Sequence, residues 1–407
     1  MKQRLLNQYA KLIAKVGANV RKGDYVTIVA GIENADFIMK VVKECYKLKA
    51  ADVEIRWQSD EFTRIRLQNT KESILSKVEN WEIEKMKLAI EREPVMIYID
   101  SEDPDSLKGV DQGKLGRMRQ ARGKVIKPLR DQMENKYKWV IAAVPGEKWA
   151  NKVFPNMTKK QAEDALFEAI LKTSRAYDGD PEENWRIHNA NLQKHCELLN
   201  SMDIDELEYS ASNGTNLKIG LIKGSVFEAG SEKTISGEVF NPNIPSEEVF
   251  TTPDRLRVNG IVYSSKPLAY NGQIIDKFWV RFENGKAVES HAEVNDELLK
   301  IIIDTDEGSH YLGECALVPF SSPVNKTGIL FYNTLFDENA VCHLALGRGF
   351  NETHPGFADM TDEELFNIGI NDSLIHVDFM IGTEDLKITA ITRSGERKLI
   401  FNGDWLI

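Results

Sequence analysis

The sequence predicts two structural halves: an α/β N-terminal domain with a largely parallel sheet, and an α+β, strand-rich C-terminal domain. The chain has 407 residues, which exceeds one compact core of roughly 100–200 residues. Helical and strand patterns alternate in the first half, whereas short strands separated by tight turns fill the second. We therefore expect two domains, covering residues 1–200 and 201–407.

The first half reads as successive βαβ units. Apolar residues recur at helical spacing from Leu5 to Val16 and again from Phe37 to Cys45. Four short runs rich in β-branched or aromatic residues read as buried strands. They are Tyr25–Ala30, Val53–Trp57, Val95–Ile99 and Trp139–Val144. Because helices connect such strands, we expect them to pair in parallel.

The second half begins after a long helix expected over residues 181–202, which Pro181 opens. Asn-Gly and Ser-Gly turns then separate runs of strand-forming residues, and such turns are typical of hairpins. The two clearest hairpins pair Phe278–Phe282 with Lys286–Glu289, and Ile388–Thr392 with Arg397–Phe401.

Composition argues against several classes of partner. Lys and Arg number 52 against 63 Asp and Glu, a net charge of −11, which disfavours nucleic acid and anionic membranes as partners. No apolar run reaches the ~18 residues of a membrane span. Basic residues interrupt the N-terminal stretch, so we expect no secretory signal. The four cysteines form no CxxC pair, and we expect a reducing cytoplasm.

The pair His376 and Asp378 is the first chemical signal. Side chains alternate along a strand, so this imidazole and this carboxylate point to one face while Val377 and Phe379 point to the other. Such a pair can grip a metal ion. An exposed polar strand face would give the same pattern.

Three further acidic segments lie in the same half. Glu314 is embedded in the apolar run Leu312–Val318, where a carboxylate needs a cation or an edge. Glu338 and His343 are five residues apart and converge only if the backbone turns between them. Glu247 and Glu248 open an apolar strand.

Together these segments supply two imidazoles and at least four carboxylates. These are more ligands than one zinc ion normally takes. Their number suits two divalent ions that share a carboxylate, as in two-metal hydrolases. Zinc, cobalt and manganese all accept these ligands. His188 and His195 share a face of the expected long helix, and we expect that face to be solvated rather than metal-binding.

Four strings in the second half carry a family resemblance: NPNIPSEEVFTTPD (Asn241–Asp254), GECALVP (Gly313–Pro319), NAVCHLALGRGF (Asn339–Phe350) and HVDFMIG (His376–Gly382). They resemble the thermophilic metallo-aminopeptidases of the aminopeptidase T and S type. The first half is similar to the same family in VRKGDYVTI (Val20–Ile28). The resemblance implies an enzyme that removes N-terminal residues from peptides with a free N-terminus, and a homodimer with an enclosed active site.

The resemblance also implies a site. It places the two-metal ligands on Glu248, Glu314, Glu338, His343, His376 and Asp378, with Glu314 as the bridging carboxylate. Glu338 is either a ligand or a residue that orients His343. Glu247 is a general base, a supporting acid or a solvated residue. Family members carry a hydroxylated aromatic after the glycine-rich stretch, whereas this chain has Phe350 there.

Two alternatives remain at this point. One is a dipeptidase or another two-metal amidohydrolase. The other is a non-catalytic binding protein that metal ions merely stabilise.

Overall fold

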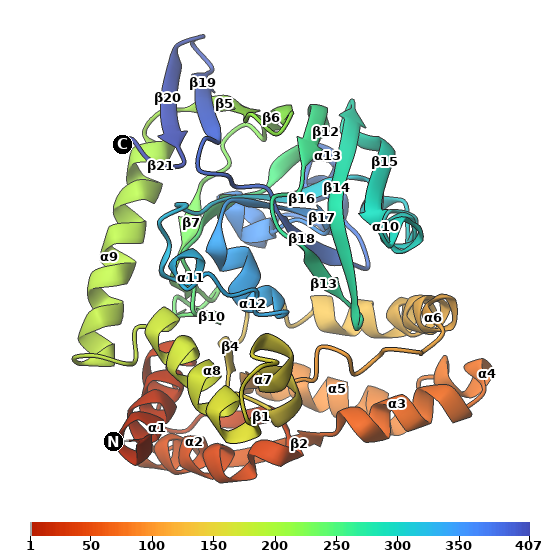
Figure 1. The fold of residues 1–407 in the computed structure, drawn as a ribbon, viewed down its shortest axis with the longest axis vertical. Helices are drawn as coiled ribbons and strands as arrows, with labels where there is room; N and C mark the ends of the chain where they lie inside the picture. The colour runs from red at the N-terminus through yellow and green to blue at the C-terminus, as the bar shows by residue number, and fades with distance from the viewer. Residues whose placement is uncertain (1) are drawn as a thin grey trace. The chain divides into compact units, whose positions relative to one another are not determined.

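A computed structural model describes residues 2–407 of the chain. The chain divides into two compact units. The first contains the residues up to His188 together with Ser231–Ser246, and the second contains Asn189–Gly230 together with Glu247–Ile407 (Figure 1). The chain leaves the first unit within helix α9 (Pro181–Asn200) and later returns to it for one short segment. The expected division at residue 200 stays a prediction.

The first unit is built on a parallel sheet, as the alternating pattern predicted. Its strands follow the order β10-β4-β3-β1-β2, and every neighbouring pair is parallel. Four of them match the expected strands within two residues at each end. The strands are β1 (Tyr25–Gly31), β2 (Asp52–Gln58), β3 (Val95–Asp100), β4 (Trp139–Ala143) and β10 (Asn243–Ile244). Strand β10 belongs to the returning segment, which also forms the small pair β8 (Glu232–Lys233) and β9 (Val239–Phe240).

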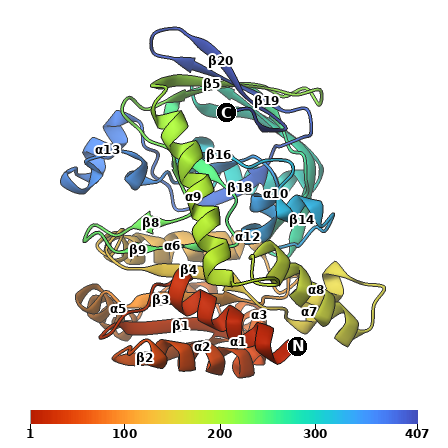
Figure 2. The same ribbon diagram turned by 90° about the vertical axis from the view of Figure 1, so that its left-hand side faces the viewer.

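Helices connect the strands of this sheet. Helices α1 and α2 pack against each other, and α2 also contacts β1 and β2 (Figure 2). Side chains cap the N-termini of two of these helices. At α3 the Ser59 hydroxyl accepts a hydrogen bond from the backbone N–H of Phe62, and at α8 Thr158 forms a capping box with Gln161. The helices are α1 (Lys2–Leu12), α2 (Ala35–Lys47), α3 (Asp60–Asn69), α4 (Glu72–Leu75), α5 (Asn80–Arg92), α6 (Gln112–Asp131), α7 (Glu147–Val153) and α8 (Lys159–Thr173).

The second unit contains a large antiparallel sheet and a smaller one. In the large sheet the order is β13-β14-β12-β6-β5-β19-β20-β21, and β15 pairs with β14. Both expected hairpins are confirmed. At the first, Asn284 and Gly285 adopt φ values of 49° and 85°, the left-handed region that a two-residue hairpin turn requires. The strands are β5 (Ile204–Ser210), β6 (Asn216–Leu221), β12 (Pro253–Tyr263), β13 (Leu268–Tyr270), β14 (Gln273–Glu283), β15 (Lys286–Val294), β19 (Lys387–Thr392), β20 (Arg397–Asn402) and β21 (Asp404–Trp405).

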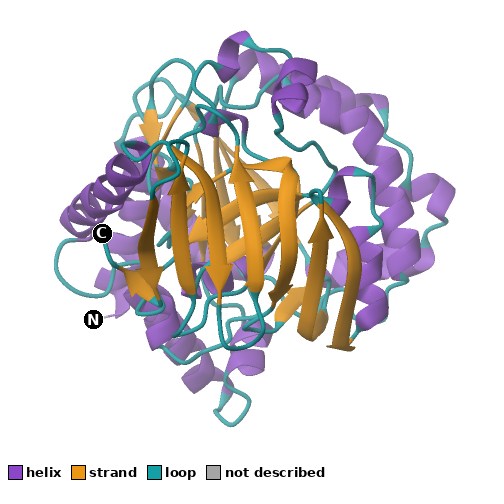
Figure 3. Cartoon of the chain, turned by 90° about the horizontal axis from the view of Figure 1, so that it is seen from above, coloured by secondary structure: helices purple, strands orange, loops and turns teal. Residues whose placement is uncertain are grey.

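The smaller sheet has the order β18-β17-β16-β11-β7 and is antiparallel. Its strands are β7 (Glu228–Ala229), β11 (Val249–Thr251), β16 (Leu312–Leu317), β17 (His343–Gly347) and β18 (His376–Met380). Figure 3 colours the strands orange and shows several of them as neighbouring arrows. The helices of this unit after α9 are α10 (Asp296–Ile303), α11 (Pro323–Lys326), α12 (Thr334–Asp337) and α13 (Asp362–Ile368).

One hydrophobic cluster joins the two sheets of the second unit. Cys315, Leu344 and Phe379 of the small sheet belong to it together with Phe278 of the large sheet. The ring centroids of Phe278 and Phe379 are 5.7 Å apart. Because side chains alternate along a strand, the intervening residues of β16, β17 and β18 face away from this core. That opposite face carries the predicted site residues of these strands.

The expectation of a solvated His188 is wrong. His188 is buried, its Nε2 lies 2.7 Å from the Ser246 carbonyl oxygen, and its ring packs edge-on against Trp185. Since a carbonyl oxygen only accepts, Nε2 carries the hydrogen in this bond. His195 stacks on Trp405 instead of facing water alone. Neither histidine belongs to a group of metal-ligand geometry among residues 2–407.

None of the helices within residues 2–407 combines the length and the apolar character that crossing a membrane requires.

Candidate metal centre

The register of the small sheet places the predicted ligands on one face. Glu314 of β16 lies opposite Ala345 of β17, and Ala345 lies opposite Asp378 of β18. Directly opposed residues in an antiparallel sheet point to the same side. His343 and His376 are each two residues from a member of this row and therefore share its face. Ala345, with its small side chain, lies between the two carboxylates in this row.

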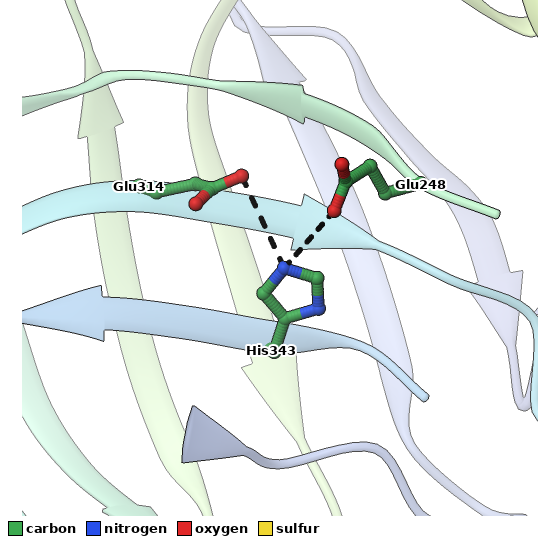
Figure 4. A group of neighbouring side chains, drawn as sticks. All are labelled: Glu248, Glu314 and His343. Carbon is green, nitrogen blue, oxygen red and sulfur yellow. Dashed lines mark ion pairs between the residues drawn. The ribbon is translucent and has the colours of Figure 1, made fainter. Parts of the chain in front are cut away.

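Glu248, Glu314 and His343 form a first group, in which each residue offers a ligand atom within 4.8 Å of the others. Figure 4 shows the His343 ring turned toward both carboxylates, which come from β16 and from the residue before β11. His343 Nε2 lies 3.3 Å from Glu248 Oε2 and 4.0 Å from Glu314 Oε1. All three side chains are buried.

Glu314, His376 and Asp378 form a second group within the same distance limit. His376 Nε2 lies 3.1 Å from Glu314 Oε2 and 3.2 Å from Asp378 Oδ1. The His376 side chain is 26% exposed, so the second group opens toward solvent whereas the first does not. Glu314 belongs to both groups and offers a different oxygen to each histidine.

Hydrogen bonds hold the His376 ring in a ligand-ready orientation. Its Nδ1 lies 2.7 Å from the Arg348 carbonyl oxygen, which can only accept, so Nδ1 carries a hydrogen. In the neutral ring the Nε2 lone pair then faces Glu314 and Asp378. Metal-binding histidines commonly donate their second ring N–H to a carbonyl or carboxylate in this manner. The Phe350 ring packs against His376, with centroids 4.9 Å apart.

The electrostatics of the cluster show an excess of negative charge. Burial, only partly opposed by His376, raises the pKa of Glu314 to about 7. Burial and the charges of Asp378 and Glu248 raise the pKa of Glu338 well above its usual value. Burial alone would lower the pKa of His343, yet Glu248 and Glu314 raise it to about 9. Without a metal ion, Glu314 and Glu338 therefore bind protons at pH values at which an exposed glutamate would be ionised.

A divalent cation fits these residues. His343 Nε2 is buried and has no hydrogen-bond partner, although two carboxylates surround it. An imidazole lone pair aimed at carboxylates is unfavourable unless a proton or a metal ion lies between them. Mixed imidazole and carboxylate donors suit zinc, cobalt and manganese. Each group of three is thus a candidate cation position, and Glu314 belongs to both groups.

The structure brings together five of the predicted ligands and places the sixth beside them. Glu338 is buried and lies in hydrogen-bonding contact with Asp378, but it belongs to neither group of three. Glu247 is also buried, and its backbone N–H donates to Asn339 Oδ1 at 2.6 Å. Sequence reasoning missed Asn339 and the ring contact of Phe350, because neither has a spacing signal.

Comparisons with known proteins agree with this geometry. Residues 2–405 match the family described as Thermophilic metalloprotease (M29). The chain belongs to the M29 family. It is 40% identical over 402 residues to "Aminopeptidase AmpS" of Bacillus subtilis, covering 98% of each chain. It is 36% identical over 407 residues to "Aminopeptidase T" of Thermus thermophilus, covering 100% of this chain and 99% of the other.

A solved M29 structure has the same fold. Wild-type AmpT from Thermus thermophilus superposes with a TM-score of 0.90 at 35% identity, and the match covers 100% of both chains. The family resemblance and the fold class expected from the sequence are thus confirmed. As an M29 metalloprotease, the chain is a hydrolase of peptide bonds that uses divalent metal.

Proposed function

We propose that this M29 metallo-aminopeptidase holds two divalent ions, one at each group of three, with Glu314 shared between them. The observation that carries the proposal is the position of Glu314, whose two oxygens face His343 and His376 separately. Glu248 and His343 would complete one position, and His376 and Asp378 the other. Glu338 would be a further ligand on the side of Asp378.

When bound, the ions would lower the pKa of a water molecule and polarise the scissile carbonyl. The side chains supply the remaining chemistry. Glu247 is the proposed general base, a buried carboxylate next in sequence to a ligand, and its oxygens would take the proton of the attacking water. The Arg348 carbonyl keeps a hydrogen on His376 Nδ1 and so leaves Nε2 free to coordinate.

The excess of carboxylates over imidazoles also supports a preference for substrates with a free N-terminus. Three acids belong to the two groups and Glu338 beside them is a fourth, whereas only two imidazoles oppose them. The free α-amino group of a peptide offers a positive charge that an acid of this cluster would bind or, once deprotonated, a lone pair that one of the ions would bind. An acetylated N-terminus lacks that charge. We therefore propose that the enzyme requires a free α-amino group.

The test compares leucine p-nitroanilide with its N-acetylated form, each after chelation and after zinc, cobalt or manganese is added back. We expect metal-dependent cleavage of the unblocked compound alone. Cleavage of both compounds would contradict the aminopeptidase proposal and favour a less selective amidohydrolase. Cleavage of neither, with metal shown to be bound, would overturn it.

The family resemblance supports a further proposal about the assembly, and the cysteines support one about the compartment. We propose a homodimer, for which sedimentation should give twice the 46.1 kDa of one chain, and a monomer would contradict it. We also propose a reducing cytoplasm as the compartment, since Cys45, Cys196, Cys315 and Cys342 are free and buried. Cell fractionation tests this second proposal, and recovery outside the cytoplasm would contradict it.

A further inference from the structure

We infer that Asn339 is a positioning residue of the metal centre, because its amide joins the two chain segments that present Glu248 and Glu338. The inference rests on the proposed two-ion function and adds a residue that no spacing pattern indicates. Asn339 is not itself a proposed ligand, although it contacts the Glu338 carboxylate. It acts through its neighbours.

The side-chain hydrogen bonds of Asn339 are buried, and one of them joins it to a residue far away in the sequence. Its Oδ1 accepts the backbone N–H of Glu247 at 2.6 Å, across 92 positions of sequence. Its Nδ2 donates to the Leu335 carbonyl oxygen at 2.9 Å and to Glu338 Oε1 at 3.4 Å. The residue is fully buried, with 0% of its surface exposed. One amide group therefore contacts both acidic segments and helix α12.

The orientation of this amide follows from its partners. A backbone N–H can only donate, and a backbone carbonyl can only accept. Reversing the amide would set Nδ2 against the Glu247 N–H and Oδ1 against the Leu335 oxygen and the Glu338 carboxylate. Three favourable contacts would become three repulsive ones. The chain thus fixes which atom of Asn339 meets Glu338.

Both acidic segments lie outside regular strands at the point where Asn339 holds them. Glu248 comes one residue before β11, and Glu338 begins the single helical turn η4 (Glu338–Ala340). By contrast, the backbones of Glu314, His343 and Asp378 are held within the strand ladder. Glu248 and Glu338 therefore depend more on side-chain ties for their position. Residues that orient metal ligands commonly contribute 10–100-fold to metal affinity.

The test titrates Co²⁺ into chelator-stripped full-length protein and follows the absorption bands of the bound ion. Asn339→Ala is expected to raise the Co²⁺ dissociation constant by about 10–100-fold. Asn184→Ala is the matched control, because Asn184 Nδ2 also donates to two backbone carbonyls, of Arg175 at 3.0 Å and Asp178 at 2.7 Å, far along the chain from any candidate ligand. This control should bind Co²⁺ with wild-type affinity.

A second variant guards against misfolding of the first. Asn339→Asp keeps the shape and the acceptor for the Glu247 N–H but loses the N–H groups that meet the Leu335 oxygen and the Glu338 carboxylate. Its bound Co²⁺ should give an altered absorption spectrum. Wild-type affinity in Asn339→Ala, or a wild-type spectrum in Asn339→Asp, would overturn the inference. If wild-type protein failed to bind Co²⁺, or if Glu248→Ala bound it unchanged, the proposed function itself would fail.

Discussion

The buried carboxyl of Glu338 destabilises the folded protein when no metal ion is bound. Its carboxyl is buried beside Asp378, with Glu248 and Glu314 nearby, and these surroundings raise its pKa. A carboxyl whose pKa is higher in the folded protein destabilises the fold at pH values above its ordinary pKa. Bound cations would remove this penalty. The same residue therefore opposes folding without metal and supports metal binding.

The first prediction is that Glu338→Gln stabilises the metal-free protein while weakening its affinity for metal. Glutamine keeps an oxygen for the Asn339 amide but never has to lose a proton or carry buried charge. We expect the free energy of unfolding at pH 7 to rise by about 1–3 kcal/mol. Urea unfolding of chelated protein measures it. A lower stability of Glu338→Gln than of wild type would count against this account.

Some site residues were predictable because local geometry is enough to group them. The two-residue period of a strand pairs His376 with Asp378, and an acid in an apolar run singles out Glu314. Asn339 and His188 were not predictable, since their roles depend on distant partners. Glu247 lies 92 positions from Asn339, and Ser246 lies 58 positions from His188. No local pattern records such contacts.

At the scale of elements, the strand order of the small sheet assembles the site. β11, β16, β17 and β18 come from separate stretches of chain, yet they pair in the order that aligns Glu314, Ala345 and Asp378. The hairpins of the large sheet were predictable because their turns are local. The pairing of β11 with β16 was not, since β11 has three residues and its partner begins more than sixty residues later.

The large sheet provides a prediction with a defined pH dependence. Glu208 of β5 pairs with Lys218 of β6 at 2.7 Å and with Arg397 of β20. The hydrogen bonds from Arg397 and Lys218 lower the pKa of Glu208 to about 2. Because this pKa is depressed in the folded state, the pairing stabilises at pH values above the ordinary glutamate pKa, and its contribution is lost as the pH falls toward 2.

Glu208→Gln should therefore lower the free energy of unfolding by about 1 kcal/mol at pH 7, since the side chain is partly exposed and screened by solvent. The difference from wild type should shrink as the pH falls from about 5 to about 3. Denaturant unfolding across this range is the measurement. A difference that stays constant with pH would show that the ion pairs are not its source.

At the scale of the whole molecule, a largely parallel sheet and a strand-rich second half followed from alternating patterns. The return of Ser231–Ser246 to the first unit did not, because β10 has only two residues. Such a strand has no detectable period, and its place beside β4 depends on tertiary contacts. One of these is the hydrogen bond that the backbone N–H of Asn241 donates to the Gly17 carbonyl oxygen at 2.8 Å.

Metal removal should lower the melting temperature of the whole chain. A ligand that binds only the folded state stabilises it by about 2.7 kcal/mol at one hundred times its dissociation constant. The ions would also neutralise the buried carboxylates of the centre. Calorimetry with and without chelator tests this, with Glu314→Gln as the comparison. Equal melting temperatures for wild type in both conditions would contradict it.

Whether two ions share Glu314 is tested most directly by a crystal structure of the Co²⁺-loaded protein with an anomalous difference map. We predict two peaks about 3.5–4 Å apart, one near Glu248 and His343, the other near His376 and Asp378, with Glu314 in contact with both. A single peak, or two peaks that do not share Glu314, would contradict the account.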